Sequence, residues 1–420
     1  MLFRSNPDAE VIKTILAITN NPERRQEPYH IIAEIRDAKN FEVTKMVGRD
    51  EVEIVTVGYL ISRIIAQTCR QSGLSIVYNE LLDFGGDEIY FKEEPALVGK
   101  TFKDSLFAYE DSSIIGVWRP GSIPQLNPAM DFVLAAGDQL IAISEDDDTV
   151  ILSGKNEYGI SEKVILEKTA SSHPSEKTLI LGWNWRGKTI VSELDQYVPQ
   201  GSEIQVVSKY TEVEDCINEL SKSMKNASVI FKPGDTSDRQ LLNSLDIQQY
   251  NHIVLLCYSD ELNQQEADAQ TLITLLHLRD IARIADKDFS IVSEMMDIRN
   301  RTLAEITEAD DFIVSNRIIS LMLAQVSENK QLNAVFEDVF DPEGSEIYLK
   351  PAELYIKAGE AVNFYTVVEA ACRRGEIAIG YRKKADSKNA EKAYGVVVNP
   401  DKSEMLTFEA GDRIILVAEE

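Results

Sequence analysis

Three acidic residues of this 420-residue chain have the chemistry of ligands for a hard cation. Asp235, Asp260 and Glu294 each lie at or just beyond the end of an apolar run that predicts a buried β-strand. The carboxyl ends of parallel strands meet at one edge of a sheet, where ligands of such folds gather. Calcium takes about six to eight oxygen ligands from carboxylates, carbonyls and water. We therefore expect a calcium site at this edge. The alternative is structural, with Asp235 capping a helix and Glu294 accepting backbone hydrogen bonds.

The stretch from Thr178 to Val206 predicts a strand, a turn, an amphipathic helix and a second strand. In nucleotide-binding versions of this unit, glycines let the backbone approach a pyrophosphate, and an acidic residue after the second strand holds the ribose. Here the turn begins with Gly182 and Trp183, and Lys209 stands where the acid is expected. These three residues predict a degenerate nucleotide cleft in which NAD is disfavoured. An adenine nucleotide in another pose, with its phosphate at Lys209, stays open.

The charge balance excludes one class of partner. The chain has 43 basic and 70 acidic residues, for a net charge of -27. Nucleic-acid binding depends on Lys and Arg contacts that release counterions, so we expect no nucleic-acid partner. The acidity either serves solubility alone or concentrates cations near the surface. No stretch approaches eighteen uninterrupted apolar residues, so the sequence predicts no segment that spans a membrane by itself.

The motifs of common enzymes are missing from the sequence. It contains no Gly-x-Ser-x-Gly elbow, no phosphate loop ending in Gly-Lys-Ser/Thr and no His-Glu-x-x-His. The four cysteines are scattered without a Cys-x-x-Cys pair, which indicates free thiols in a reducing compartment and no structural zinc. We expect a protein without catalytic activity, and a dehydrogenase is the leading enzyme alternative.

The sequence also contains an internal repeat. Short sequence motifs recur at a spacing of 260 residues or slightly more, which predicts a duplicated architecture with loop insertions. The matched pairs are Asp8/Asp268, Glu34/Glu294, Asp37/Asp297, Asn40/Asn300, Ile115-Gly116/Ile379-Gly380, Asn127-Pro128/Asn399-Pro400 and Gly137-Asp138/Gly411-Asp412.

The first copy lacks a counterpart of residues 178–260, which hold four predicted strands of the second copy. Those strands are Leu179–Leu181, Ile204–Val207, Val229–Phe231 and Ile253–Leu256. Half of a parallel sheet would leave an apolar edge unpaired. We expect that the natural chain begins upstream; the alternative is that another chain supplies the missing half.

The order of elements carries a family resemblance. A Rossmann-like half precedes a predicted helix-turn-helix, Arg317–Glu328 and Leu332–Phe340, and a small β-rich lobe that ends at Ala410–Val417. This order resembles the RCK (regulator of potassium conductance) and TrkA-type modules of potassium channels and transporters. The Gly182-Trp183 turn, the tandem arrangement and the word Gly234-Asp235-Thr236 are similar to the Castor/Pollux cation channels.

The resemblance implies an α/β fold class, with Rossmann-like parallel sheets, helix-turn-helix units and small β-rich C-lobes in a tandem RCK repeat. The implied domains are the C-terminal half of a first Rossmann-like lobe at 1–50, the first helix-turn-helix and C-lobe at 51–152, a linker at 153–177, a second Rossmann-like lobe at 178–307, and the second helix-turn-helix and C-lobe at 308–420.

The function implied by the resemblance is a ligand-sensing gating domain of a potassium-type cation channel, at the cytoplasmic face of a membrane. Calcium is the expected ligand. The pore domain would lie upstream in the same gene or in a separate subunit, and homo-oligomers would form a tetrameric ring. The helix-turn-helix would pair with another module, or the two copies would pack on each other within the chain. The alternative function is a TrkA-like nucleotide-sensing subunit of a potassium transporter.

Overall fold

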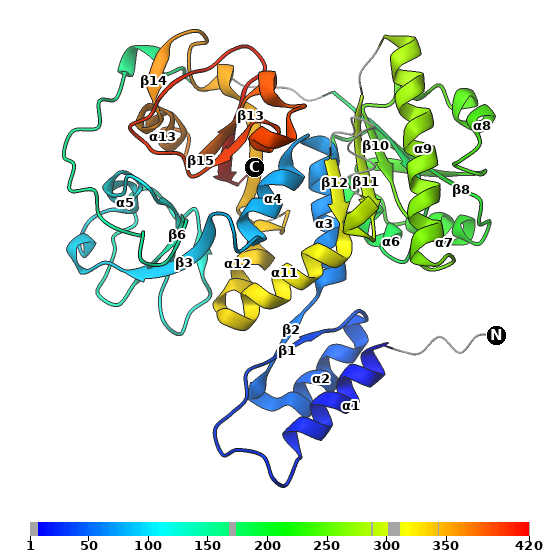
Figure 1. The fold of residues 1–420 in the computed structure, drawn as a ribbon, viewed down its shortest axis with the longest axis horizontal. Coiled ribbons are helices and arrows are strands. Elements are labelled where there is room, and N and C mark those ends of the chain that lie inside the picture. The colour runs from blue at the N-terminus through cyan, green and yellow to red at the C-terminus, as the bar shows by residue number, and fades with distance from the viewer. Residues whose placement is uncertain (1–6, 168–173, 287–288, 301–310, 343, 420) are drawn as a thin grey trace.

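The computed structural model describes residues 7–167, 174–286, 289–300, 311–342 and 344–419. Figure 1 shows a small N-terminal α/β unit, a larger α/β unit and two β-rich lobes around a central group of helices. This arrangement confirms the predicted fold class. Residues 168–173 of the predicted linker and the domain boundary predicted at 307/308 lie outside the described residues. Within the described ranges, no helix is both long enough and apolar enough to cross a membrane.

The larger α/β unit is a parallel sheet of six strands in the order β12-β11-β10-β7-β8-β9. Apolar runs form these strands because both faces of the sheet are covered by helices. The order is that of dinucleotide-binding folds, with the switch point between β7 and β10. Its strands are β7 (Lys177–Leu181), β8 (Ser202–Ser208), β9 (Ala227–Pro233), β10 (His252–Leu255), β11 (Ser290–Met295) and β12 (Asp311–Val314). Its helices are α6 (Gly187–Tyr197), α7 (Val213–Leu220), α8 (Arg239–Ser244) and α9 (Gln264–Ala285).

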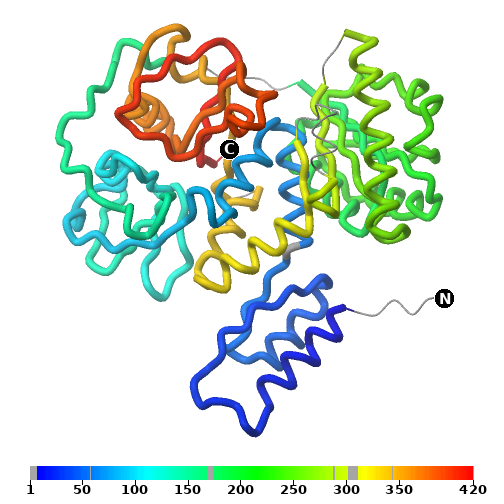
Figure 2. The backbone as a smooth tube through the Cα atoms, viewed as in Figure 1, coloured from blue at the N-terminus to red at the C-terminus, as the bar shows by residue number. Residues whose placement is uncertain are grey.

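The N-terminal unit repeats only the end of that architecture. It contains α1 (Pro7–Thr19), β1 (Ile31–Glu34), α2 (Phe41–Gly48) and β2 (Val52–Val55). The two strands pair in parallel and occupy the repeat positions of β11 and β12. Figure 2 shows this unit, in blue, set apart from the larger sheet and connected to it through the central helices.

The repeated acidic and amide residues fasten a helix to a strand end in both copies. Asp8 on α1 accepts hydrogen bonds from the backbone N–H groups of Arg36 and Asp37, at 3.1 and 3.0 Å, and from the Asn40 amide at 2.7 Å. In the second copy, Asp268 accepts from the N–H groups of Met296 and Asp297 and from Asn300, at 2.9, 3.0 and 2.8 Å. The same hydrogen-bond network in both copies therefore explains why these aspartate and asparagine residues recur.

Each copy also ends in an antiparallel lobe, with strand orders β3-β6-β4-β5 and β13-β18-β15-β16. Both lobes have a bulge at a matched glycine. A Cβ on Gly116 would lie 2.4 Å from the Gln125 carbonyl oxygen, and one on Gly380 would lie 2.3 Å from that of Val397. The first lobe contains β3 (Glu88–Glu93), α5 (Phe102–Ala108), β4 (Ser113–Trp118), β5 (Gln125–Leu126) and β6 (Gln139–Ser144). The second contains β13 (Glu346–Pro351), β14 (Ala361–Asn363), α13 (Phe364–Cys372), β15 (Ile377–Arg382), β16 (Val396–Val398), β17 (Met405–Thr407) and β18 (Arg413–Ala418).

The two helix-turn-helix units cross between the copies. They are α3 (Val57–Arg70) with α4 (Leu74–Leu82), and α11 (Ser315–Glu328) with α12 (Gln331–Val339). From the first copy, α3 packs on α6, β10 and β11 of the larger sheet, while α11 of the second copy packs on β1, α3 and α4. Asp311 at the start of β12 accepts hydrogen bonds from the Gly73 N–H at 2.9 Å and the Ser75 hydroxyl at 2.5 Å, where α4 begins. The predicted packing of the two copies on each other within the chain is present. Pairing with another module stays a prediction.

Candidate functional site

The turn between β7 and α6 keeps the backbone of a phosphate loop and fills it with side chains. Gly182 has a φ of +93°, and a Cβ there would lie 2.0 Å from the carbonyl oxygen of Leu256, so only glycine fits. The indole of Trp183 lies against Gly187, where a Cβ would come within 2.7 Å of the ring. The predicted tight turn is therefore present, but Trp183 covers the helix start that a pyrophosphate would approach.

Behind this turn, a buried ion pair joins Arg186 to Glu294 at the end of β11. Glu294 is 1% exposed and Arg186 is 5% exposed. Glu294 also accepts hydrogen bonds from the Asn184 amide at 2.7 Å and the Ser315 hydroxyl at 2.8 Å. Burial, followed by the nearby Glu294 carboxylate, raises the pKa of the neighbouring Cys257 thiol well above its usual value. Glu294 is thus a charge-compensated anchor that connects the turn, β11 and α11.

The turn also contacts the first copy of the repeat. Trp185 is 39% exposed, and its indole lies so close to α3 that a Cβ on Gly58 would come within 2.0 Å of it. The guanidinium groups of Arg186 and Arg36 lie 4.9 and 5.9 Å from the indole centroid. Asn184, Arg186 and Ser315 were not predicted as site residues. The sequence feature that could have indicated Asn184 and Arg186 is their position in the rewritten turn, and Ser315 has no such feature.

Lys209 and Asp235 lie at the carboxyl ends of β8 and β9. The Lys209 ammonium donates to the Gln270 amide oxygen at 3.0 Å and lies 4.9 Å from the ring centroid of Tyr258. Asp235 accepts from the N–H and hydroxyl of Ser237, at 2.9 and 2.7 Å. Desolvation raises the pKa of Asp235, but the Ser237 hydrogen bonds and the Lys209 charge outweigh it, so that the net pKa lies below its usual value. Asp235 is therefore an ionised carboxylate beside a lysine.

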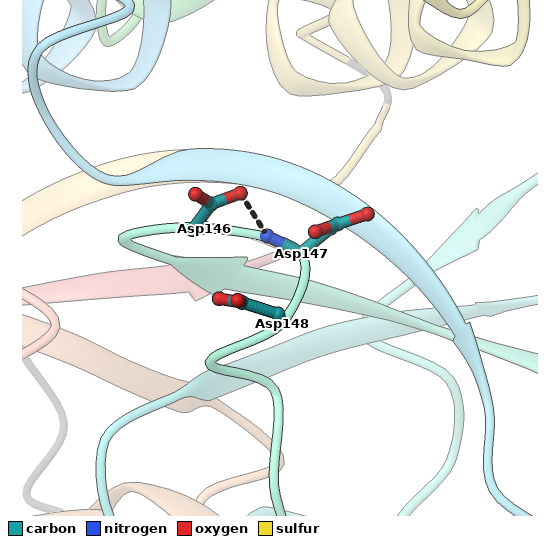
Figure 3. A group of neighbouring side chains, drawn as sticks. All are labelled: Asp146, Asp147 and Asp148. Atoms are coloured by element: carbon teal, nitrogen blue, oxygen red, sulfur yellow. Dashed lines mark hydrogen bonds between the residues drawn. The ribbon is translucent and has the colours of Figure 1, made fainter.

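The predicted calcium ligands do not form a close group. Within the described ranges, one set of three acidic residues has ligand atoms within 4.8 Å of one another, and this set is Asp146, Asp147 and Asp148 in the loop after β6. Figure 3 shows these exposed side chains and the hydrogen bond, 2.7 Å long, from the Asp147 N–H to the Asp146 carboxylate. Asp235, Asp260 and Glu294 therefore make no preformed site in this arrangement, and calcium binding there stays a prediction.

The sequence is similar to a family model and to ion channels of plants. Residues 58–158 match the family model described as Castor and Pollux, part of voltage-gated ion channel. The ion channel CASTOR of Lotus japonicus is 30% identical over 432 residues, which cover 94% of this chain and 49% of that protein. A probable ion channel CASTOR of Oryza sativa subsp. japonica is 29% identical over 453 residues, covering 98% of this chain and 49% of that protein. The chain thus spans about half the length of these relatives.

A solved structure gives the fold. The human SLO3 gating ring superposes with a TM-score of 0.68 at 14% identity, covering 98% of this chain and 84% of that chain. At this identity the likeness concerns the fold alone. The chain therefore has the fold of a gating-ring region and resembles the Castor/Pollux ion channels over nearly its whole length.

Proposed function

We propose that this chain is the ligand-sensing gating region of a potassium-type cation channel and that it acts on a pore outside the chain. The proposal is supported by the similarity of the chain to ion channels and by the gating-ring fold. In this function the region lies at the cytoplasmic face of the membrane and assembles with further copies into a tetrameric ring. It performs no catalysis.

The observation that carries the proposal is the crossing of the helix-turn-helix units between the copies. Trp185 of the turn lies against Gly58 at the start of α3, and α3 leads directly from β2 of the N-terminal unit. In the proposed function, a change in the turn at the sheet edge would be transmitted through α3 to the N-terminal unit. Such coupling requires that a ligand bind one arrangement more tightly than the other.

Calcium is the ligand that we propose, with Asp235 and Asp260 at the edge of the sheet as its candidate ligands. The oxygens of Glu294 are already engaged by Arg186, Asn184 and Ser315, so we assign it an anchoring function in this arrangement. NAD is not proposed as a ligand, because Trp183 lies over Gly187, where a pyrophosphate would need close approach.

Current recordings on the complete channel test the proposal. Trp185→Ala removes the contact with Gly58, and we expect it to change the ligand concentration that gives half-maximal opening while the single-channel conductance is unchanged. Ile123→Ala is the matched control, because Ile123 is 80% exposed and far from the turn in sequence.

Calcium titration of the isolated chain tests the ligand separately. We expect saturable binding that Asp235→Asn combined with Asp260→Asn weakens. Unchanged calcium binding in that double variant would remove these residues as ligands, whereas absence of a cation current from the complete protein would overturn the channel function itself.

A further inference from the structure

A cavity of about 460 Å³ lies at the junction of the two β-rich lobes, away from the edge of the larger sheet. Its walls come from α5 of the first lobe, from the segment that connects the lobes and from Glu369 on α13 of the second lobe. Its size is within the range of pockets that bind small molecules. The apolar part of the wall is formed by Leu97, Phe107, Ala108, Leu152, Tyr158 and Ile160.

The charged part of the wall is mainly cationic, although the chain carries a net charge of -27. Lys100, Lys103 and Lys155 line the cavity together with two carboxylates, those of Asp104 and Glu369. Among the lining residues the three ammonium groups outnumber the two carboxylates, and the Glu110 carboxylate outside the lining pairs with Lys155. The net negative charge of the protein repels anions, but three lysines lie together around this cavity.

Both carboxylates have partners in the protein, and one partner of Glu369 is the cavity residue Lys103. Asp104 forms the capping box of α5, in which it accepts from the Thr101 N–H at 2.8 Å. Glu369 pairs with Lys103 at 2.9 Å and with Arg373 at 2.9 Å. Lys155 pairs with Glu110, whereas the Lys100 side chain forms no ion pair within the described ranges. Lys100 is also exposed, so its ammonium group is accessible to a ligand.

Aromatic rings lie beside these lysines. Phe107 and Tyr158 both line the cavity, with their ring centroids 5.3 Å apart and their planes tilted by 46°. The Lys103 ammonium lies 6.0 Å from the Phe107 centroid. Tyr158 is half-buried and packs on Tyr365 of the second lobe, with centroids 4.9 Å apart. A flat ring on a ligand would therefore meet an aromatic wall with cationic groups next to it.

The lysine on α5 is not a feature of the repeated scaffold. Phe102 begins α5 after the N-cap Thr101, and Phe364 begins α13 after the N-cap Asn363. The next residue is Lys103 in the first lobe and Tyr365 in the second. The scaffold thus folds with a tyrosine at this position, and the lysine adds charge to the cavity without being needed for the helix.

We propose that this cavity binds a nucleoside phosphate, with the phosphate at Lys100, Lys103 and Lys155 and the base against Tyr158 and Phe107. Lysine binds phosphate as a point charge. Among the described residues Lys100 forms no ion pair, whereas Lys103 and Lys155 would exchange their pairs with Glu369 and Glu110 for the phosphate. A nucleoside phosphate joins such a group to a flat ring. This inference rests on the geometry of the lobes and does not depend on the proposed channel function.

Calorimetric titration of the whole chain tests the site, with ADP, adenosine and inorganic phosphate as probes. We expect saturable ADP binding and weaker binding of adenosine and of phosphate, since each lacks one half of the recognised group. Lys100→Glu should weaken ADP binding by roughly tenfold or more, because it reverses a charge at the phosphate. Lys103→Gln should weaken it as well.

Two control variants distinguish this cavity from ADP binding elsewhere on the chain. Lys163→Glu makes the same charge reversal at an exposed residue outside the cavity lining, and ADP binding should be unchanged. Lys209→Gln removes the cation of the degenerate nucleotide cleft and should also leave ADP binding unchanged. The proposal is overturned if ADP does not bind at millimolar concentration, if Lys100→Glu binds ADP as tightly as the natural chain, or if Lys209→Gln alone abolishes binding.

Discussion

In the turn between β7 and α6, side chains of the protein occupy the space that a ligand would take in a nucleotide-binding fold. In place of a pyrophosphate, the turn holds the indole of Trp183, and Arg186 forms a buried ion pair with Glu294. A buried pair is costly to desolvate, and it contributes little net stability until one partner is removed, which leaves an uncompensated charge. The residues that make the cleft unsuitable for a dinucleotide are thus the ones on which its folded arrangement depends.

Removing the Glu294 carboxylate tests this anchoring function. We expect Glu294→Gln to lower the free energy of unfolding by about 3–5 kcal/mol, because Arg186 would stay buried without a counter-charge. Urea unfolding followed by tryptophan fluorescence measures the change. Glu203→Gln is the control: Glu203 pairs with Lys177 at 2.9 Å on the surface, and its loss should cost about 0.2–1 kcal/mol. A Glu294→Gln variant as stable as this control would contradict the anchoring function.

At the scale of elements, a helix is fastened to the end of a neighbouring strand by one aspartate in each copy. Asp8 and Asp268 are buried, and each accepts from two backbone N–H groups that follow a strand. Those N–H groups have no ladder partner once the strand has ended, so leaving them unpaired would be costly. This requirement explains why an aspartate stands at the same position of both copies.

The two aspartates serve as controls for each other. Asp268→Asn retains one acceptor oxygen and loses the other, and we expect a local destabilisation of about 1–3 kcal/mol. Amide hydrogen exchange should become faster at Met296 and Asp297 and stay unchanged at Arg36 and Asp37. The reverse pattern is expected for Asp8→Asn. Equal acceleration in both copies from either variant would show that the networks are not local.

For the whole molecule, the contact between the two β-rich lobes includes a buried lysine. Lys402, on the loop after β16 of the second lobe, is 1% exposed, and its ammonium group donates to the carbonyl oxygens of Tyr109, at 2.8 Å, and Ser112 of the first lobe. Desolvation lowers the pKa of Lys402 to about 7, although Glu110, Asp111 and Asp401 oppose this shift. The lobes are therefore joined by a group that changes charge near neutral pH.

The pH dependence of stability follows from this shift. The unfolded chain binds the lysine proton up to about pH 10.5, whereas the folded chain releases it above about pH 7. Stability therefore rises with pH in this window, because the unfolded state holds more protons. Lys402→Met should abolish that rise, and Met130 already occupies the repeat-related position of the first lobe. Unfolding free energies measured between pH 7 and 10 would contradict the assignment if the variant and natural chains had parallel profiles.

The sequence by itself determined the duplicated plan, four strands of the larger sheet and the second helix-turn-helix unit. These features are predictable from local periodicity and from recurring dipeptides such as Ile-Gly and Asn-Pro. The dipeptides recur because the same backbone geometry recurs in each lobe. They require no knowledge of which distant residues meet. The glycine turn was predictable in the same way, since Gly182 is the residue type that its φ requires.

Only the tertiary structure decided the partners of the functional side chains. Glu294 was predicted as a calcium ligand, but its oxygens are engaged by Arg186, which lies 108 residues earlier in the chain. The helix α11 is apolar on more than one face, a pattern that fits a partner within the chain as well as one outside it. The cavity between the lobes likewise joins Lys100, Tyr158 and Glu369, whose proximity depends on how the lobes pack and on no spacing in the sequence.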